Sequence, residues 1–181
     1  MSLFSATLST ALALLALGAI LLWNGPALAR AAKQFPRSPA ATFVCFGGAS
    51  AWFLWRIAHL SAADFGDYRV ALLCLFGVVA VGAYFVARDF LAVRGLAILC
   101  LLCAQPLLAA AFLQPPQSRL FLVGFTYVVL IPAGLVLGAM PYLLRDLLAW
   151  LWQKPARPRV LGAAFAAYGI LLTAVAYTYP A

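Results

Sequence analysis

Long apolar runs alternate with short polar connections along the whole chain. Six runs come close to the roughly 20 residues that a helix needs to cross a lipid bilayer. They cover residues 3–23, 40–60, 70–87, 95–113, 120–143 and 160–179. A backbone in hydrocarbon has no water to bond, so such spans must be helices, and they lack the alternation of β-barrel strands. The pattern predicts an all-α, polytopic integral membrane helix bundle with about six transmembrane helices in one domain, residues 1–181.

The first run has the position of a signal peptide as well as the length of a spanning helix. No positive charge precedes it, and its apolar core is longer than the roughly 7–15 residues of a signal sequence. We therefore expect a retained helix that stops at Asn24-Gly25-Pro26.

The fifth connection, LRDLLAWLWQK, carries a helical pattern of its own. Its leucines recur at helical spacing, at Leu144, Leu147, Leu148 and Leu151. This spacing predicts a short amphipathic helix along the membrane surface, with Trp150 and Trp152 at the depth of the headgroups. A second interpretation is that the segment extends the fifth span past Pro141.

Composition agrees with a membrane protein. Hydrophobic residues make up 67% of the chain and charged residues only 9%, whereas soluble domains carry roughly 25% charged residues. The net charge of +8 comes from twelve Lys and Arg against four acidic residues. These cations lie in the connections, where they report topology and contact with membrane lipids. We therefore expect no nucleic acid partner.

The basic residues also predict which way the chain is threaded. The odd connections hold Arg30, Lys33, Arg37, Arg88, Arg94, Arg145, Lys154, Arg157 and Arg159, and the even ones hold Arg56, Arg69 and Arg119. Connections rich in Lys and Arg stay in the cytoplasm. The count predicts a multi-pass protein of a bacterial-type inner membrane, with both termini on the outer, periplasmic side.

Residues 100–106, CLLCAQP, resemble a redox or metal site more than any other stretch does. Redox-active thiols sit at accessible helix N-termini, whereas Cys100 and Cys103 fall inside a span, where free cysteine behaves as a small hydrophobe. A metal site would need further thiolates, such as Cys45 and Cys74, in hydrocarbon. We expect packing, no metal and no cofactor. Gln105 is expected to bond to a neighbouring helix or, alternatively, to contact a ligand.

The end of the second span collects polar and aromatic side chains on one helical face. Trp52, Trp55, Arg56 and His59 follow at i, i+3, i+4 and i+7. We expect an interfacial anchor, with the indoles in the aromatic belt and the guanidinium at lipid phosphates. The alternative is a ligand site that holds a quinone headgroup or supplies one axial ligand to a haem.

Small residues indicate where helices approach one another. Gly134 and Gly138 form a G-x-x-x-G motif in the fifth span, and Gly162, Ala166 and Gly169 lie along one side of the sixth. These positions are the expected helix-packing residues.

Functionally, the spans hold small-residue faces and no paired carboxylates or His/Asp constellation of an enzyme. We expect a non-catalytic integral membrane subunit or scaffold of a larger membrane protein complex, with other subunits or a second copy as partners. Two alternatives remain: a redox membrane anchor associated with quinone or haem, and a transporter of small solutes or lipids that works around Gln105, Pro106 and Pro132.

Overall fold

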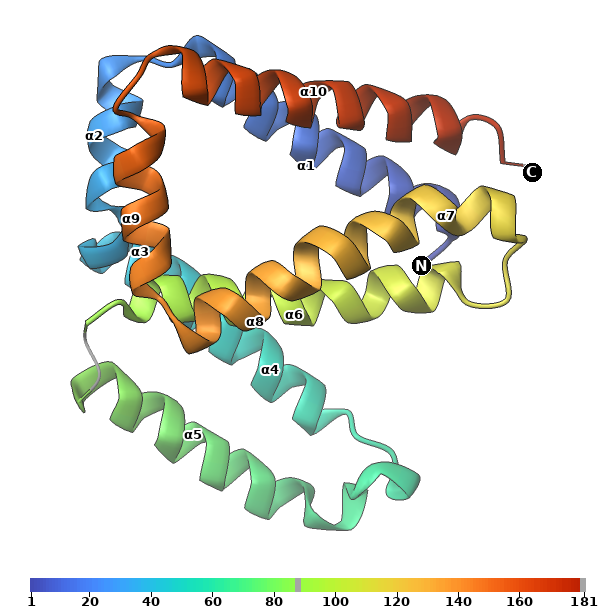
Figure 1. The fold of residues 1–181 in the computed structure, drawn as a ribbon. Coiled ribbons are helices and arrows are strands. Elements are labelled where there is room, and N and C mark those ends of the chain that lie inside the picture. The colour runs from blue at the N-terminus through green and yellow to red at the C-terminus, as the bar shows by residue number, and fades with distance from the viewer. Residues whose placement is uncertain (87–88, 180–181) are drawn as a thin grey trace.

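The computed structural model describes residues 1–86 and 89–179 and is helical almost throughout (Figure 1). Six of the helical segments in these ranges are long and apolar enough to cross a membrane. The predicted all-α, multi-pass membrane bundle is therefore confirmed. Arg88, one of the basic residues used to predict the threading, lies outside the described residues.

The spans are single helices or helices joined end to end. In chain order they are α1 (Leu3–Trp23); α3 (Pro39–Thr42), the π-helical turn η2 (Phe43–Gly47) and α4 (Gly48–Ala58); the 3₁₀ turn η4 (Gly66–Tyr68) and α5 (Arg69–Val86); α6 (Leu91–Ala111); α7 (Pro116–Phe125), the π-helical turn η5 (Thr126–Leu130) and α8 (Ile131–Ala139); and α10 (Ala156–Ala176).

Two further helices, α2 (Pro26–Gln34) and α9 (Tyr142–Leu151), run across one end of the bundle. They lie beside each other and roughly perpendicular to the spans (Figure 1). We call this the α2–α9 end, and the opposite end, which holds the N-terminus and Tyr179, the terminal end. The sequence pattern did not predict α2 as a helix, because its short apolar face was hidden in a basic connection.

α9 is a separate helix, so the fifth span ends at Ala139 rather than at 143. The break is at Met140, whose φ of −129° and ψ of 70° are not helical. A residue before proline is pushed out of the α region by the proline ring, and Pro141 follows directly. Of the two interpretations of residues 144–154, the structure has the separate short helix, from Tyr142 to Leu151.

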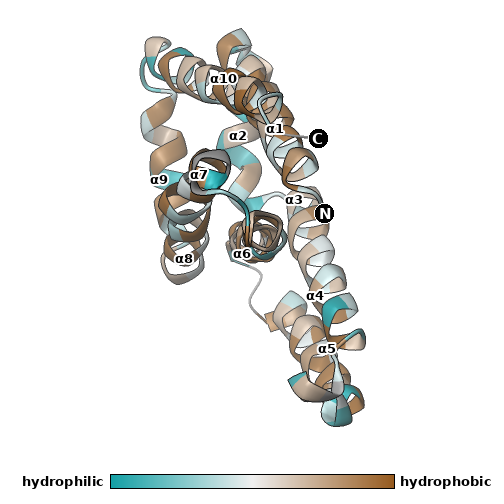
Figure 2. Cartoon of the chain, turned by 90° about the vertical axis from the view of Figure 1, so that its right-hand side faces the viewer, coloured by the Kyte–Doolittle hydropathy of each residue, from teal (hydrophilic) through white to brown (hydrophobic). Residues whose placement is uncertain are grey.

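The spans form three layers, which are seen end on in Figure 2. One layer is α1 with α10, the middle layer is α6 with α7 and α8, and the third is α4 with α5. Apolar side chains cover most of the outward helix surface, as expected for a bundle surrounded by lipid.

Glycines bring α1 and α10 into close backbone contact. A Cβ atom at Gly18 would lie 2.8 Å from the backbone oxygen of Gly162, and one at Gly162 would lie 2.9 Å from the oxygen of Gly18. A Cβ at Gly169 would lie 2.8 Å from the Leu15 side chain and 3.0 Å from the backbone oxygen of Ala11. No larger side chain fits at these positions, so the pairing of the first and last spans depends on them.

The middle layer is fixed by two more glycines. A Cβ at Gly95 of α6 would lie 2.4 Å from the backbone nitrogen of Phe46, where α6 crosses η2. A Cβ at Gly134 of α8 would lie 2.8 Å from the Leu101 side chain of α6. α6 is therefore the helix on which the second and fifth spans both pack.

At the terminal end the first two layers meet in an apolar cluster. Its buried members come from α1, α6 and α7, and they are Leu3, Ala6, Leu107, Ala110, Ala111 and Leu122. Tyr179 packs against this cluster, and its hydroxyl lies 3.1 Å from the Thr7 hydroxyl. The layers are thus joined here, while toward the α2–α9 end they diverge (Figure 1).

Gly95→Ala tests the crossing of α6 and η2. The added methyl group collides with backbone atoms that cannot rotate away, so we expect a loss of about 1–3 kcal/mol of stability. Gly77→Ala is the matched control, since nothing lies within 4 Å of a Cβ there. Thermal unfolding in detergent, followed by circular dichroism, should show a lower Tm for the first variant only. Equal Tm values would contradict the contact.

Candidate functional site

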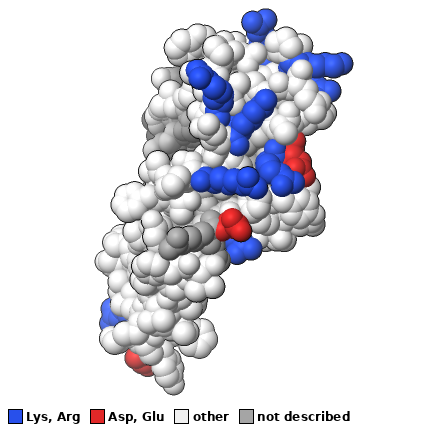
Figure 3. All heavy atoms as spheres, turned by 90° about the vertical axis from the view of Figure 1, so that its left-hand side faces the viewer, with Lys and Arg blue, Asp and Glu red and all other residues white. Residues whose placement is uncertain are grey.

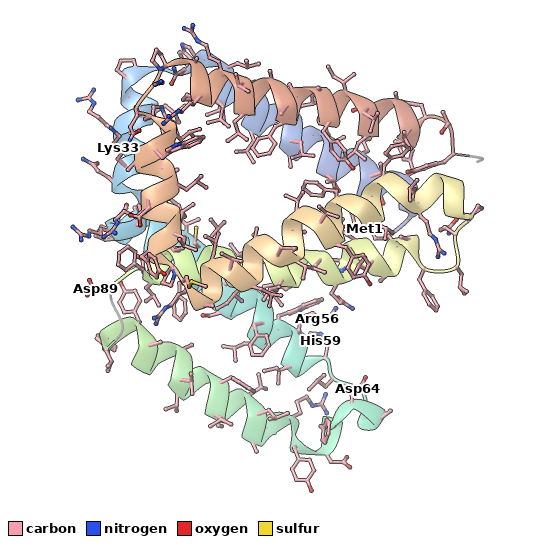
Figure 4. The ribbon with its side chains drawn as sticks, in the orientation of Figure 1. Met1, Lys33, Arg56, His59, Asp64 and Asp89 are labelled. Atoms are coloured by element: carbon pink, nitrogen blue, oxygen red, sulfur yellow. The ribbon has the colours of Figure 1, made fainter. Side chains whose placement is uncertain are left out.

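The aromatic and basic face of α4 lies at the terminal end, beside the connection to α5. Figure 4 shows Arg56 and His59 there, near Asp64 and far from Lys33 and Asp89 at the other end. The imidazole Nδ1 of His59 lies 2.8 Å from the Trp55 carbonyl oxygen. The centres of the His59 and Trp55 rings are 4.7 Å apart. With Nδ1 donating to that carbonyl, Nε2 faces outward as a free acceptor.

This face is open rather than built into a pocket. Trp55, Arg56 and His59 are exposed and Trp52 is half-buried. The Asp64 carboxylate accepts a hydrogen bond from Ser61 Oγ at 2.9 Å, and Arg69 donates to the Ala58 carbonyl at 3.3 Å. Neither bonds to His59. Chemically, the face offers one imidazole beside the Trp55 indole, and a second histidine ligand to a haem would have to come from another chain, because His59 is the only histidine in the sequence.

Gln105 is exposed on the surface of α6 and makes no hydrogen bond among the described residues. It lies two helical turns after Ile98, so both project from the same face. Ile98 lines an apolar groove of about 280 Å³ that Phe46, Ser50 and Phe53 of the second span and Phe76 and Val79 of α5 complete. The exposed amide thus lies on the same face of α6 as this groove, two helical turns from its lining residue Ile98.

The cysteines do not gather into a site. All four are free, and Cys74 lies exposed on α5, away from the α6 pair Cys100 and Cys103. Within residues 1–86 and 89–179, no three His, Cys, Asp or Glu side chains stand close enough to share a metal ion.

The predicted packing residues lie at two separate interfaces. Gly162, Ala166 and Gly169 of α10 face α1, and Gly134 of α8 faces α6. Gly138 is looser, since a Cβ there would lie 3.8 Å from Ala97, an ordinary contact. Sequence reasoning missed Gly18 and Gly95, although a glycine inside an apolar span is itself a signal of close packing.

Sequence reasoning also missed a hollow between the diverging layers. The hollow has a volume of about 670 Å³ and is walled by η5, α8 and α9, with Pro132 in one wall. A second hollow of about 310 Å³ shares Val128 and Val129 with it and reaches Phe165 and Tyr168 of α10. We call the larger hollow the trough. No periodicity in the sequence could indicate it, because it depends on the angle between two layers.

Trp150 and one charged residue, Asp146, line the trough on the side of α9. Arg145 forms an ion pair with Asp146 at 2.8 Å, and the Arg157 guanidinium stacks over the Trp150 ring, 4.2 Å from its centre. Arg157 also donates to the Trp150 carbonyl at 2.7 Å and to Gln153 at 3.0 Å. Figure 3 shows the Lys and Arg side chains that gather on this end of the molecule.

Asn24 holds the corner at which α1, α9 and α10 meet. It ends α1 with a left-handed backbone, φ 47°. Its amide donates to the Pro155 carbonyl at 3.1 Å, and its oxygen accepts from the Trp152 indole at 3.1 Å. This clamp fixes the end of α9 to the first span.

A scan against protein-family models and searches of curated proteins and of solved structures find no match to this chain.

Asn24→Gly tests the clamp. Glycine keeps the left-handed backbone but removes both side-chain hydrogen bonds, so we expect a loss of about 1–3 kcal/mol. Asn24→Asp keeps only the hydrogen bond from Trp152, so its Tm should lie between that of Asn24→Gly and that of the wild type. Thermal unfolding in detergent measures the stability. The clamp is refuted if Asn24→Gly unfolds at the wild-type temperature.

Proposed function

We propose that this chain is a non-catalytic integral membrane subunit, or scaffold, of a larger membrane protein complex. The observation that carries the proposal is α5. No residue of this apolar helix is buried, and α4 is the span on which it packs most.

The attachment of α5 supports a partner there. Its aromatic contact with α4 is the edge-to-face pair of Phe53 and Phe76, with ring centres 5.1 Å apart. Nothing lies within 4 Å of a Cβ at Gly77 or Gly82, whereas a Cβ at Gly18, Gly95 or Gly162 would meet a neighbouring span. Helices in lipid associate through close packing and polar contacts rather than through burial of apolar surface. A helix so weakly held by its own chain gains most from a second protein.

Gln105 supports the same surface. A side-chain amide that faces hydrocarbon with no hydrogen bond carries a desolvation cost, which a polar group on another helix would remove. The amide lies two helical turns along α6 from Ile98, which lines the groove between α4, α5 and α6. We propose that a transmembrane helix of the partner, or of a second copy, packs along this groove and bonds to Gln105.

The proposed location is a bacterial-type inner membrane, with the α2–α9 end in the cytoplasm. That end holds Lys33 and Asp89, and His59, Asp64 and Met1 lie at the other (Figure 4). The odd connections therefore share one end and the even ones share the other. Basic residues favour the cytoplasmic side, which leaves both termini outside.

Gln105→Leu tests the partner surface. Since the amide makes no hydrogen bond to residues that the structure describes, the variant should keep its thermal stability but lose most of the larger complex. Gentle-detergent purification followed by native mass spectrometry measures the mass of the complex that each variant forms. Leu17→Ala, an exposed change on α1, is the control and should keep the complex. If the wild-type chain runs alone as a monomer, the proposal fails.

Cysteine labelling tests the orientation. In a chain whose four cysteines are replaced by alanine, Lys33→Cys and Lys154→Cys should react with a membrane-impermeant maleimide only after the cytoplasmic side is opened. Asp67→Cys should react in intact cells. Labelling of residues 33 and 154 from opposite sides would refute the threading.

A further inference from the structure

A polar hollow of about 460 Å³ lies where the second span, the third span and the start of α6 meet. Its lining comes from the 3₁₀ turn η1 (Phe35–Arg37), from α3 and α5, and from the connection into α6. The lining residues are Arg37, Pro39, Thr42, Tyr84, Asp89 and Leu91. We call this hollow the interface pocket. Unlike the trough and the groove beside α5, it is lined by charged residues of both signs.

The interface pocket lies at the boundary between hydrocarbon and water. Thr42 is in the first turn of the second span, and Tyr84 is in the last turn of the third. Leu91 is the first residue of α6, and Asp89 precedes it in the connection. Figure 4 places Asp89 at the α2–α9 end of the molecule. A pocket formed at the ends of three spans is at the depth where lipid headgroups lie.

The lining offers both hydrogen-bond donors and acceptors. Arg37 carries a planar fork of donors that suits phosphate oxygens, and the Tyr84 hydroxyl adds a donor. Asp89 supplies a carboxylate. The Thr42 hydroxyl donates to the Ser38 carbonyl at 3.0 Å, which leaves its lone pairs as acceptors. Within residues 1–86 and 89–179 no ion pair joins Arg37 to Asp89, so the two charges do not neutralise each other.

We propose that the interface pocket binds the phosphoethanolamine headgroup of a membrane lipid. Arg37 and Tyr84 hold the phosphate. Asp89 and Thr42 hold the primary ammonium. A phosphate alone would face Asp89, and an ammonium alone would face Arg37, so a group that carries both charges matches the lining best. Val81 is exposed one turn deeper than Tyr84 on the same face of α5, and it offers apolar surface to an acyl chain.

The same lining distinguishes ethanolamine from other headgroups. Choline keeps the positive charge, but its quaternary ammonium has no N–H to donate to Asp89 or Thr42. Glycerol has no positive charge at all. The depth of the pocket, at the ends of the spans, favours a lipid over a free zwitterion. The site is separate from the contact proposed at Gln105 and does not depend on a partner protein.

The test uses the full chain in a neutral detergent. Phosphatidylethanolamine, phosphatidylcholine or phosphatidylglycerol with identical acyl chains is added, and thermal unfolding is followed by tryptophan fluorescence. At saturation, phosphatidylethanolamine should raise the Tm by about 3–6 °C more than either of the other lipids does. Soluble glycerophosphoethanolamine should give little of this shift. A shift equal to that of the lipid would overturn the lipid as the source of the group.

Two charge variants separate the two halves of the headgroup. Asp89→Asn should remove most of the preference for phosphatidylethanolamine, because the ammonium loses its opposite charge. Arg37→Gln should reduce the response to all three lipids, because all three carry the phosphate. Both side chains are exposed, so neither change should alter the Tm without lipid much. Asp146→Asn and Arg30→Gln change residues that do not line the pocket, and these controls should keep the wild-type response.

Tyr84→Phe gives a milder variant of the phosphate half. It removes one hydroxyl donor and keeps the ring, so it should weaken the response to all three lipids while the preference for phosphatidylethanolamine remains. Equal Tm shifts for the three lipids in the wild type would overturn the proposal. An undiminished preference for phosphatidylethanolamine in Asp89→Asn would overturn it as well.

Discussion

Close approach of helix backbones is the interaction on which this structure depends. Inside lipid, an apolar side chain gains little by turning from hydrocarbon to protein, so helices pair where small residues let their backbones touch. The pairing of α1 with α10 follows from Gly18 and Gly162, and the crossing of α6 with η2 follows from Gly95. α5 illustrates the converse. Its glycines meet nothing within 4 Å, and it is the span that the rest of the chain holds least.

The same contacts explain why the bundle is open at one end. The apolar cluster around Leu3 and Leu122 joins the first two layers at the terminal end, while Asn24 and the two surface helices bridge them at the other. Between these fixed points the layers diverge, which leaves the trough under α9 (Figure 1).

The polar residues that attract most attention in the sequence have simpler surroundings in the structure. His59 is exposed at the end of α4 and bonded to its own helix, and the Cys100 and Cys103 thiols are free among apolar neighbours. Gln105 differs, since it is exposed and has no hydrogen-bond partner within residues 1–86 and 89–179. The candidate surfaces for function are therefore the groove beside α5 and the interface pocket, and both concern contact with other molecules in the membrane.

The sequence by itself determined the helical class, the six spans and the break at Asn24, because the length of an apolar run and the need to satisfy backbone hydrogen bonds are local properties. It also indicated the surface helix after Pro141, through the spacing of its leucines. Only the tertiary structure decided which helices touch, which way Gln105 faces, and where the trough lies. Those features depend on crossing angles between segments far apart in the chain, and apolar residues that face lipid and apolar residues that face protein look the same in one sequence.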